Sequence, residues 1–194
     1  MNYPEYVKVG DKQYKINTDF KVAIECNQIA MDETIGDFER ALAVIYKLFG
    51  SEALNDLENY ETLLDLAKKY LKCGKEVEEM QSSQEEPDMD YIQDMDYIEA
   101  SFMSDYHIDL SNTKMHWWKF NKLMGGLSNS ELGNCCILNR IRNLRNMDES
   151  KIEDAKERQR IHKAKKQFAL NKKEVQLTDK QEKSMEELNR ILGL

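Results

Sequence analysis

The chain has 194 residues, of which 41% are apolar and 33% are charged, and its formal net charge at pH 7 is −8. This length fits one domain with an appendage or two small domains, and the composition is too polar for one fully compact globule. Only 2 prolines and 8 glycines are present, which favours helices. No apolar run approaches about 18 residues and no secretory signal is visible, so we expect neither a membrane span nor export.

The first 31 residues predict a β-hairpin and a helix. Residues 6–16 alternate between apolar and polar, and Gly10 and Asp11 separate two short runs, which indicates the hairpin. Two strands alone are only marginally stable, so the hairpin must lean on a helix or on a neighbouring subunit. Asp19 is placed to cap a helix over residues 20–31.

Two further helices follow in the N-terminal half. Thr34 and Asp37 resemble a capping box for a helix whose apolar residues, Phe38 among them, recur at helical spacing until Gly50 ends it. Residues 60–73 carry a similar apolar stripe and predict another helix. The polar and acidic residues that follow, from about 75 to 88, are interpreted as a linker or long loop.

The central part of the chain predicts three more helices. In residues 88–106, apolar side chains recur at helical spacing and aspartates crowd the first turns, where the helix dipole favours them. Ser111 or Asn112 is expected to cap the second of these helices. Ser128 and Glu131 have the spacing of a capping box and predict the start of the third.

From about residue 148 the chain is rich in charge and poor in apolar residues. Residues 151–174 have high helix propensity but only a narrow apolar stripe, so burial alone cannot hold this helix on a core. A short amphipathic helix with a capping box at Thr178 follows. The sequence therefore predicts a mainly α fold. A small N-terminal β-hairpin packs on a helical bundle over residues 1–147, and an extended C-terminal helical arm occupies residues 148–194.

Charge is distributed unevenly along the chain. Residues 76–99 contain ten acidic and no basic residues, whereas residues 151–174 contain nine basic and four acidic ones. One interpretation is an acidic linker and a solvated helix face. The other is a pair of opposite patches that serve self-association or docking of a charged partner. The candidate residues for such contacts are Trp118, Arg140, Arg145, Arg158, Arg160, Lys165 and Lys166.

The two tryptophans, Trp117 and Trp118, are adjacent and are the only ones in the chain. Side chains of neighbouring helical residues point about 100° apart, so one apolar stripe cannot easily bury both. Trp117 and Phe120 fit the apolar stripe of their helix, and we expect them in the core, facing the helix that contains Tyr97 and Tyr106. Trp118 is left over, and it either packs from a second side or contacts a subunit or client protein.

No residue pattern points to a catalytic centre, and we expect no enzyme, bound metal or cofactor. His107, His116 and His162 are far apart and lack ligand spacing, so structural roles are expected. Cys135 and Cys136 are interpreted as core filling on a helix, and all four cysteines as reduced thiols in a cytosol. The basic side chains of residues 151–174 could bind the phosphates of a nucleic acid. However, the protein is acidic overall and lacks aromatic residues there, which makes nucleic acid a less favoured partner.

Two blocks of residues in the centre of the chain resemble a known family. The first reads DMDYIEASFMSDYHIDL and the second MHWWKFNKLMGGLS, and YKINTDFKVAIE precedes them. Their order and spacing, over roughly residues 6–145, resemble the gene-product-fifteen family of tailed phages and prophages of Gram-positive bacteria. At His107 we expect this family to carry glycine. The family-motif residues expected to form the core are Tyr97, Phe102, Tyr106, Trp117 and Phe120.

The resemblance implies a tail assembly chaperone. Such a protein binds and solubilises the tape measure protein of a long non-contractile tail, self-associates into a coat, and helps tail tube proteins assemble. Because no apolar run is long enough to span a bilayer, no membrane partner is expected. The expected location is the cytoplasm of the infected or lysogenic bacterial host, and the protein is expected to be absent from the mature virion. The alternatives are a structural tail component retained in the virion and a nucleic-acid-binding helical regulator.

Overall fold

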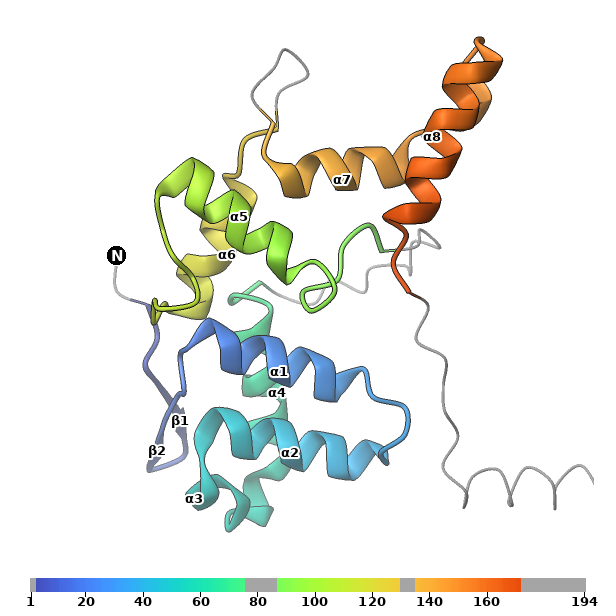
Figure 1. Cartoon of the computed structure of the whole chain (residues 1–194). Helices are drawn as coiled ribbons and strands as arrows, with labels where there is room; N and C mark the ends of the chain where they lie inside the picture. The colour runs from blue at the N-terminus through green and yellow to red at the C-terminus, as the bar shows by residue number, and fades with distance from the viewer. Residues whose placement is uncertain (1–2, 76–86, 130–134, 172–194) are drawn as a thin grey trace, which may run out of the picture. The chain divides into compact units, whose positions relative to one another are not determined.

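The structure of the protein is a computed structural model, which describes residues 3–75, 87–129 and 135–171 (Figure 1). Within these ranges it contains eight α-helices, two short 3₁₀-helices and one antiparallel sheet of two strands. The prediction of a mainly α fold with a small N-terminal β-hairpin is therefore confirmed. Contacts between residues divide the described chain into two compact units. Unit 1 consists of residues 3, 18–24, 69–75, 87–129 and 135–171, and unit 2 of residues 4–17 and 25–68.

The hairpin belongs to unit 2. Strand β1 (Tyr6–Val9) pairs antiparallel with β2 (Lys12–Lys15), and Val9 lies opposite Lys12, so Gly10 and Asp11 form the turn as predicted. Gly10 has a φ of 57°, a left-handed value that glycine adopts without a steric penalty.

A buried carboxylate, Asp56, fastens the hairpin to the helical part of unit 2. The Tyr14 hydroxyl donates a hydrogen bond to Asp56, and Lys12 Nζ lies 3.0 Å from Asp56 Oδ1. The hydrogen bond from Tyr14 is the main cause that lowers the pKa of Asp56, and it raises the pKa of Tyr14 to about 12. The hairpin also leans on α2, because Asn17 N donates to Leu48 O at 2.7 Å. The expected helical support is thus present within the unit.

The remainder of unit 2 is helical. It contains α2 (Asp37–Phe49), the short α3 (Ser51–Leu54) and the 3₁₀-helix η1 (Leu57–Asn59). Residues of α1 (Phe20–Ala30) and α4 (Tyr60–Leu71) belong partly to unit 2 and partly to unit 1. Apolar side chains that recur every three or four residues build the core. Its helical members in unit 2 include Cys26, Ala41, Val44, Ile45, Leu48, Phe49, Leu63 and Ala67.

The beginning of α2 differs from the prediction, whereas its end agrees. Thr34 and Asp37 do not form a capping box, because Asp32 Oδ1 accepts the hydrogen bond from Thr34 N at 3.0 Å and the helix starts after Gly36. The Asp32 side chain offers these residues a turn that competes with the helix. At the other end, Gly50 adopts a φ of 80° and ends the helix as predicted.

Four helices belong to unit 1. They are α5 (Met95–Tyr106), α6 (Trp117–Gly125), α7 (Ile137–Asn146) and α8 (Ala155–Gln167), with the 3₁₀-helix η2 (Glu149–Lys151) before α8. The central helices exist as predicted, but they start later than predicted. α5 starts late because Asp90 Oδ1 accepts the N–H groups of Ile92 and Gln93 and holds them in a turn. It ends at His107, whose φ of 56° is a left-handed value that glycine adopts most easily, and at this position we expected the resembled family to carry glycine.

The caps of α6 and α7 also differ from the prediction. α6 is capped by His116, whose Nδ1 accepts the N–H of the second helical residue at 3.0 Å, and not by Ser111 or Asn112. α7 follows Cys136, and the carbonyl of Ser128 accepts the N–H of Cys136 at 3.0 Å. Ser128 is therefore part of the loop before α7 and does not start that helix.

Several predictions fall on residues outside the described ranges. These include most of the expected linker over 75–88, Glu131 of the second capping box, and the helix at Thr178. The expected boundary between a body (1–147) and an arm (148–194) stays a prediction. The described part of that arm, which includes α8, belongs to unit 1.

Candidate functional site

Aromatic rings from α1, α5 and α6 stack in the core of unit 1. Phe120 is the centre of the stack, with ring centroids 4.6 Å from Phe20, 5.2 Å from Phe102 and 5.8 Å from Trp117. All four side chains are buried. Stacked rings add a specific attraction to the apolar area that they remove from water. The structure thus places Trp117 and Phe120 in the core, where Phe120 meets α5 through Phe102.

The two motif tyrosines of α5 are half-buried and reach different partners. The Tyr106 hydroxyl donates to Leu123 O at 2.9 Å, which ties the end of α5 to α6. The ring of Tyr97 lies 6.3 Å from that of Phe168, edge to face, and so contacts the residue that follows α8. Both tyrosines therefore join segments of unit 1 while keeping part of their surface exposed.

Both tryptophans bind the C-terminal end of α4. Trp117 Nε1 donates to Leu71 O and Trp118 Nε1 donates to Tyr70 O, each at 2.9 Å. The last carbonyls of a helix lack the N–H donor four residues on, and the two indoles donate to two of these carbonyls. Tyr70 O also accepts the N–H of Cys73 at 2.9 Å. Trp118 is half-buried, its ring lies 6.0 Å from that of Tyr70, and a Cβ placed on Gly74 would lie 2.9 Å from it. We call Trp117 and Trp118 of α6, with their two hydrogen bonds to α4, the tryptophan clamp.

Ion pairs join the acidic segment before α5 to α7. Arg145 donates two hydrogen bonds of 2.7 Å to the carboxylate of Asp94, which is 0% exposed, and its Nε donates to Phe168 O at 2.7 Å. Arg142 Nη2 lies 3.1 Å from Asp88 Oδ2. Arg145, a candidate for partner contacts, is thus placed in a largely buried internal pair. Asp88 and Asp94, which belong to the acidic stretch of residues 76–99, thus bind arginines of α7.

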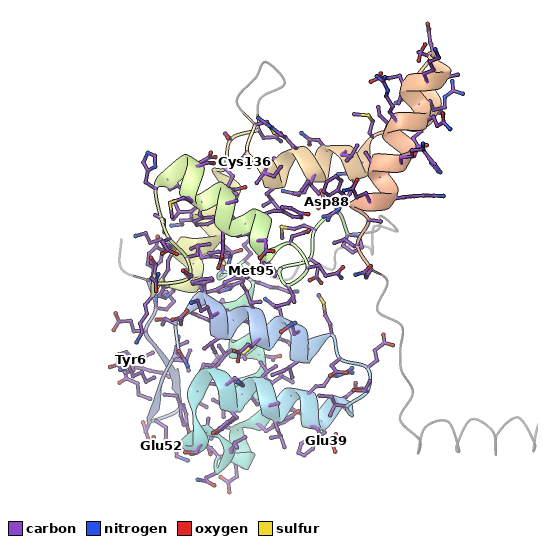
Figure 2. All side chains as sticks on the ribbon, in the orientation of Figure 1. Tyr6, Glu39, Glu52, Asp88, Met95 and Cys136 are labelled. Atoms are coloured by element: carbon purple, nitrogen blue, oxygen red, sulfur yellow. The ribbon has the colours of Figure 1, made fainter. Side chains whose placement is uncertain are left out.

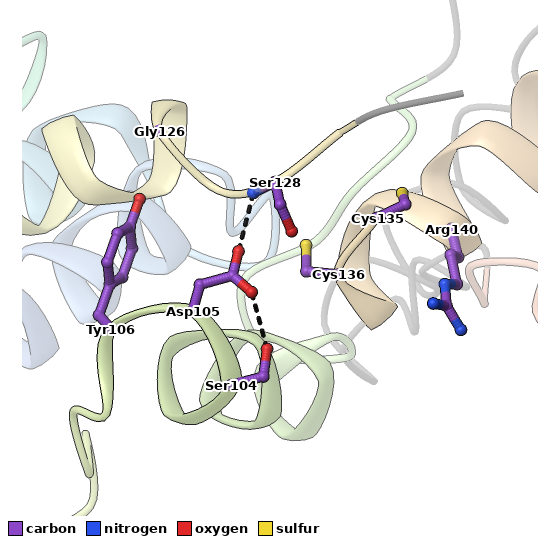
Figure 3. Close-up of a pocket in the computed structure, with 8 residues that line it drawn as sticks. All are labelled: Ser104, Asp105, Tyr106, Gly126, Ser128, Cys135, Cys136 and Arg140. Atoms are coloured by element: carbon purple, nitrogen blue, oxygen red, sulfur yellow. Dashed lines mark hydrogen bonds between the residues drawn. The ribbon is translucent and has the colours of Figure 1, made fainter. Parts of the chain in front are cut away.

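A pocket of about 520 Å³ lies between the end of α5 and the start of α7 (Figure 3). Asp105 Oδ2 accepts the N–H of Ser128 and Oδ1 accepts the hydroxyl of Ser104, both at 2.8 Å. These bonds, that of Ser128 foremost, hold the pKa of Asp105 below its usual value. The vicinal cysteines precede α7 instead of lying on it, and Cys136 is buried while Cys135 is half-buried. The lining residues are Ser104, Asp105, Tyr106, Gly126, Ser128, Cys135, Cys136 and Arg140.

A family model described as "Bacteriophage Gp15 protein" matches residues 2–170, which is most of the chain. The chain belongs to the bacteriophage Gp15 family. No curated protein and no solved structure matches it. The resemblance noted in the sequence covers only about residues 6–145, whereas the family match also includes α8. Membership assigns this Gp15-family chain to phage structure or morphogenesis.

In this Gp15-family protein, α8 has no buried residue, and its side chains project on several sides of the ribbon (Figure 2). Lys165 Nζ donates to Met147 O at 2.7 Å and Arg158 Nε donates to Ile152 O at 3.0 Å, so these two candidates face the chain before the helix. Arg160, Lys166 and, on α7, Arg140 are exposed. None of these three forms an ion pair with another described residue.

Unit 2 of the Gp15-family chain exposes apolar side chains near the start of α2. The exposed fractions are 69% for Met31, 37% for Ile35 and 54% for Phe38, and the Phe38 ring lies 5.2 Å from that of Tyr60. Phe38 shares the helical spacing of the apolar residues of α2, but the buried residues of this helix begin only at Ala41. Neighbouring exposed apolar residues often mark an interaction surface. Phe38 has helical spacing to the core residues, so the sequence alone gave no sign of its exposure.

The described histidines have structural surroundings. His116 caps α6, His107 ends α5, and His162 Nδ1 lies 3.0 Å from Glu149 Oε2 beside α8. Among residues that the structure describes, no group of three or more His, Cys, Asp or Glu side chains is placed to hold a metal ion. No helix in the described ranges has both the length and the apolar character needed to cross a bilayer.

Proposed function

We propose that this protein is a tail assembly chaperone. It binds the tape measure protein, keeps it soluble, self-associates into a coat around it and promotes assembly of the tail tube protein. Its action is non-catalytic, it takes place in the cytoplasm of the infected or lysogenic host, and the chaperone leaves before the virion is complete. Membership of a bacteriophage family over residues 2–170 supports a role in building the particle.

The observation that carries the client-binding part is the exposed apolar surface of unit 2. Met31, Ile35 and Phe38 lie within one short stretch of chain, and Phe38 is backed by Tyr60. A long helical client presents apolar stripes until it is covered, and an exposed aromatic surface can accept such a stripe as grooves accept amphipathic helices. Acidic residues flank this surface in the sequence, Glu33 among them, and would favour clients with basic residues beside the stripe.

Co-expression with the tape measure protein of the same phage tests this role. We expect the wild-type chain to move the tape measure protein from the pellet to the soluble fraction and to co-purify with it. Phe38→Asp is expected to lose this activity, since it places a charge in the apolar surface. Tyr46→Asp is the matched control, because Tyr46 is exposed to a similar extent, 51%, on the same helix. A wild-type chain that leaves its tape measure protein insoluble and unbound would overturn the proposal.

Two further measurements separate the alternatives. This chain is expected to be absent from purified virions analysed by mass spectrometry. A structural tail component would instead be detected there in amounts comparable to those of other tail proteins. A gel-shift assay at physiological salt is expected to show no complex with DNA or RNA. A shift abolished by Arg160→Glu would instead support the nucleic-acid-binding regulator, because exposed cations contact phosphates.

A further inference from the structure

Helix α8 has one tethered face and one open face. The tethered face carries Arg158 and Lys165, whose side chains bind backbone carbonyls of the chain that precedes the helix. Lys156, Arg160 and Lys163 lie within about 60° of arc on the opposite side, given 3.6 residues per turn. All three are exposed, and none pairs with an acidic residue in the described part of the chain. We call these three residues the basic stripe.

Unit 2 carries an acidic counterpart with the reverse spacing. Glu58, Glu61 and Asp65 are exposed along η1 and α4, three and then four residues apart, and we call them the acidic stripe. The basic stripe is spaced four and then three residues apart. Within the described ranges, the one ion pair of the acidic stripe is Asp65 with Lys68, at 3.7 Å and exposed on both sides, which is a weak competitor.

We propose that the basic stripe of one copy docks antiparallel on the acidic stripe of a second copy, a contact that rests on the self-association in the proposed function. In an antiparallel arrangement the reversed spacings match, because four and three helical residues advance about 6 Å and 4.5 Å on both helices. The 3₁₀ geometry at Glu58 moves that residue by only about 1–2 Å, within the reach of a lysine side chain. The pairs are Lys156–Asp65, Arg160–Glu61 and Lys163–Glu58.

The partner that docks on each stripe is a second copy of this chain, because the chain itself carries both a basic and an acidic stripe. Residues 25–68 contain ten acidic and three basic residues, whereas α8 contains six basic and one acidic, so the two regions attract each other. The two stripes are different surfaces, so a docked pair still offers one free stripe of each sign: the acidic stripe of the first copy and the basic stripe of the second. Contacts of this head-to-tail kind close into rings or continue as open helices. Repetition of the contact would produce a coat along an elongated client.

Charge-reversal variants test the contact by sedimentation velocity over a range of concentrations at low salt. Reversal of the basic stripe (K156E, R160E, K163E) and reversal of the acidic stripe (E58K, E61K, D65K) are each expected to give monomers. An equimolar mixture of the two variants, and one chain that carries all six changes, are expected to associate as the wild type does. The six-fold variant keeps the net charge of −8, so its recovery cannot come from a change in net charge.

A matched control reverses three exposed lysines outside both stripes, Lys8, Lys114 and Lys119. It changes the net charge by the same amount as reversal of the basic stripe and is expected to keep wild-type association. Far-UV circular dichroism checks that each variant is folded. Any of three outcomes overturns the proposal. These are a wild type that is monomeric at every concentration, a basic-stripe variant that still associates, and a six-fold variant that does not recover.

The same variants separate this contact from the proposed function. If the tape measure protein is still bound and solubilised when charge reversal has no effect on association, the contact is wrong and the chaperone role stands. If the six-fold variant recovers association but no chain binds the tape measure protein, the contact stands and the chaperone role is wrong. Nucleic-acid binding lost on basic-stripe reversal, with association unchanged, would show that the stripe binds phosphates, and it overturns the contact.

Discussion

Helices α6 and α8 show opposite uses of a helix in the same unit. The aromatic side chains of α6 are engaged within the fold: Phe120 and Trp117 are buried, and both indoles bind carbonyls of α4. α8 is longer, yet it has no buried residue and is held mainly by polar contacts on one side. Both tryptophan side chains thus have partners within the fold, whereas the plain charged helix keeps an open surface. Surfaces for partners are better sought on α8 and around Phe38 than at the tryptophan clamp.

The largest effect that would sharpen this contrast is expected from Phe120→Ala. The substitution removes the ring at the centre of the aromatic stack, so we expect a loss of about 4 kcal/mol in the free energy of unfolding. Ile161→Ala on α8 is the matched change, and because Ile161 is only half-buried its cost is expected to stay below about 1 kcal/mol. Urea denaturation measures both. Similar losses for the two variants would break the comparison.

Arg145→Met is expected to have the next largest effect, about 3 kcal/mol. It leaves the buried carboxylate of Asp94 without its partner, and an unpaired buried charge is strongly destabilising. Arg145 also binds Phe168 O, so amide exchange at the C-terminal end of α8 is expected to rise in this variant. Adding Asp94→Asn removes the stranded charge and is expected to recover part of the stability. If the double variant is no more stable than Arg145→Met, the buried charge is not the cause.

Trp118→Phe removes one hydrogen bond of the tryptophan clamp and keeps most of the ring. We expect a loss of about 1 kcal/mol, the usual net value of such a bond. The larger change Trp118→Ala distinguishes the two interpretations of this residue. Lost stability with unchanged self-association supports the structural role, and lost association with an unchanged Tm supports a partner contact. Denaturation and sedimentation of the same preparation give both readings.

A smaller and pH-dependent effect is expected at Asp105, beside the end of α5. Its pKa in the folded protein is lowered, chiefly by the N–H of Ser128, below the unfolded value of about 3.9. Such a carboxylate contributes stability above about pH 4, and that contribution is lost as the pH falls through the folded pKa. Asp105→Asn keeps an acceptor for Ser128 N without the charge. The difference in unfolding free energy between wild type and variant should be constant near neutral pH and shrink in acid.

Local features of the fold could be predicted, because their causes lie within a few residues. The hairpin turn at Gly10 and the end of α2 at Gly50 were both visible in the sequence. Helix starts were less predictable, because several side chains compete for the same N–H groups. Asp32 and Asp90 close turns that delay α2 and α5, and apolar spacing carries no information about such turns.

The contacts of the candidate site could not be predicted, since their partners lie far apart in the chain. The indole of Trp117 binds a carbonyl 46 residues away, and a carbonyl acceptor leaves no mark in the sequence. Arg145 and Asp94 are 51 residues apart. In the sequence, Asp94 belongs to the acidic stretch of residues 76–99, whereas Arg145 was considered a candidate for partner contacts. The excess of basic residues and the narrow apolar stripe were both visible in the sequence of the basic helix. They did not show which of its cations are tethered, and that division defines the open face of α8.

The smallest effect on stability is expected from Arg160→Ala, at the centre of the open face of α8. The side chain is exposed and has no ion pair among described residues, so the free energy of unfolding should change by less than about 0.5 kcal/mol. Self-association at low salt should nevertheless weaken, whereas Lys119→Ala on exposed α6 surface should change neither quantity. Because exposed charges are screened by salt, the difference in association between the two variants should shrink as ionic strength rises. A salt-independent difference would mean that Arg160 acts through packing and not through charge.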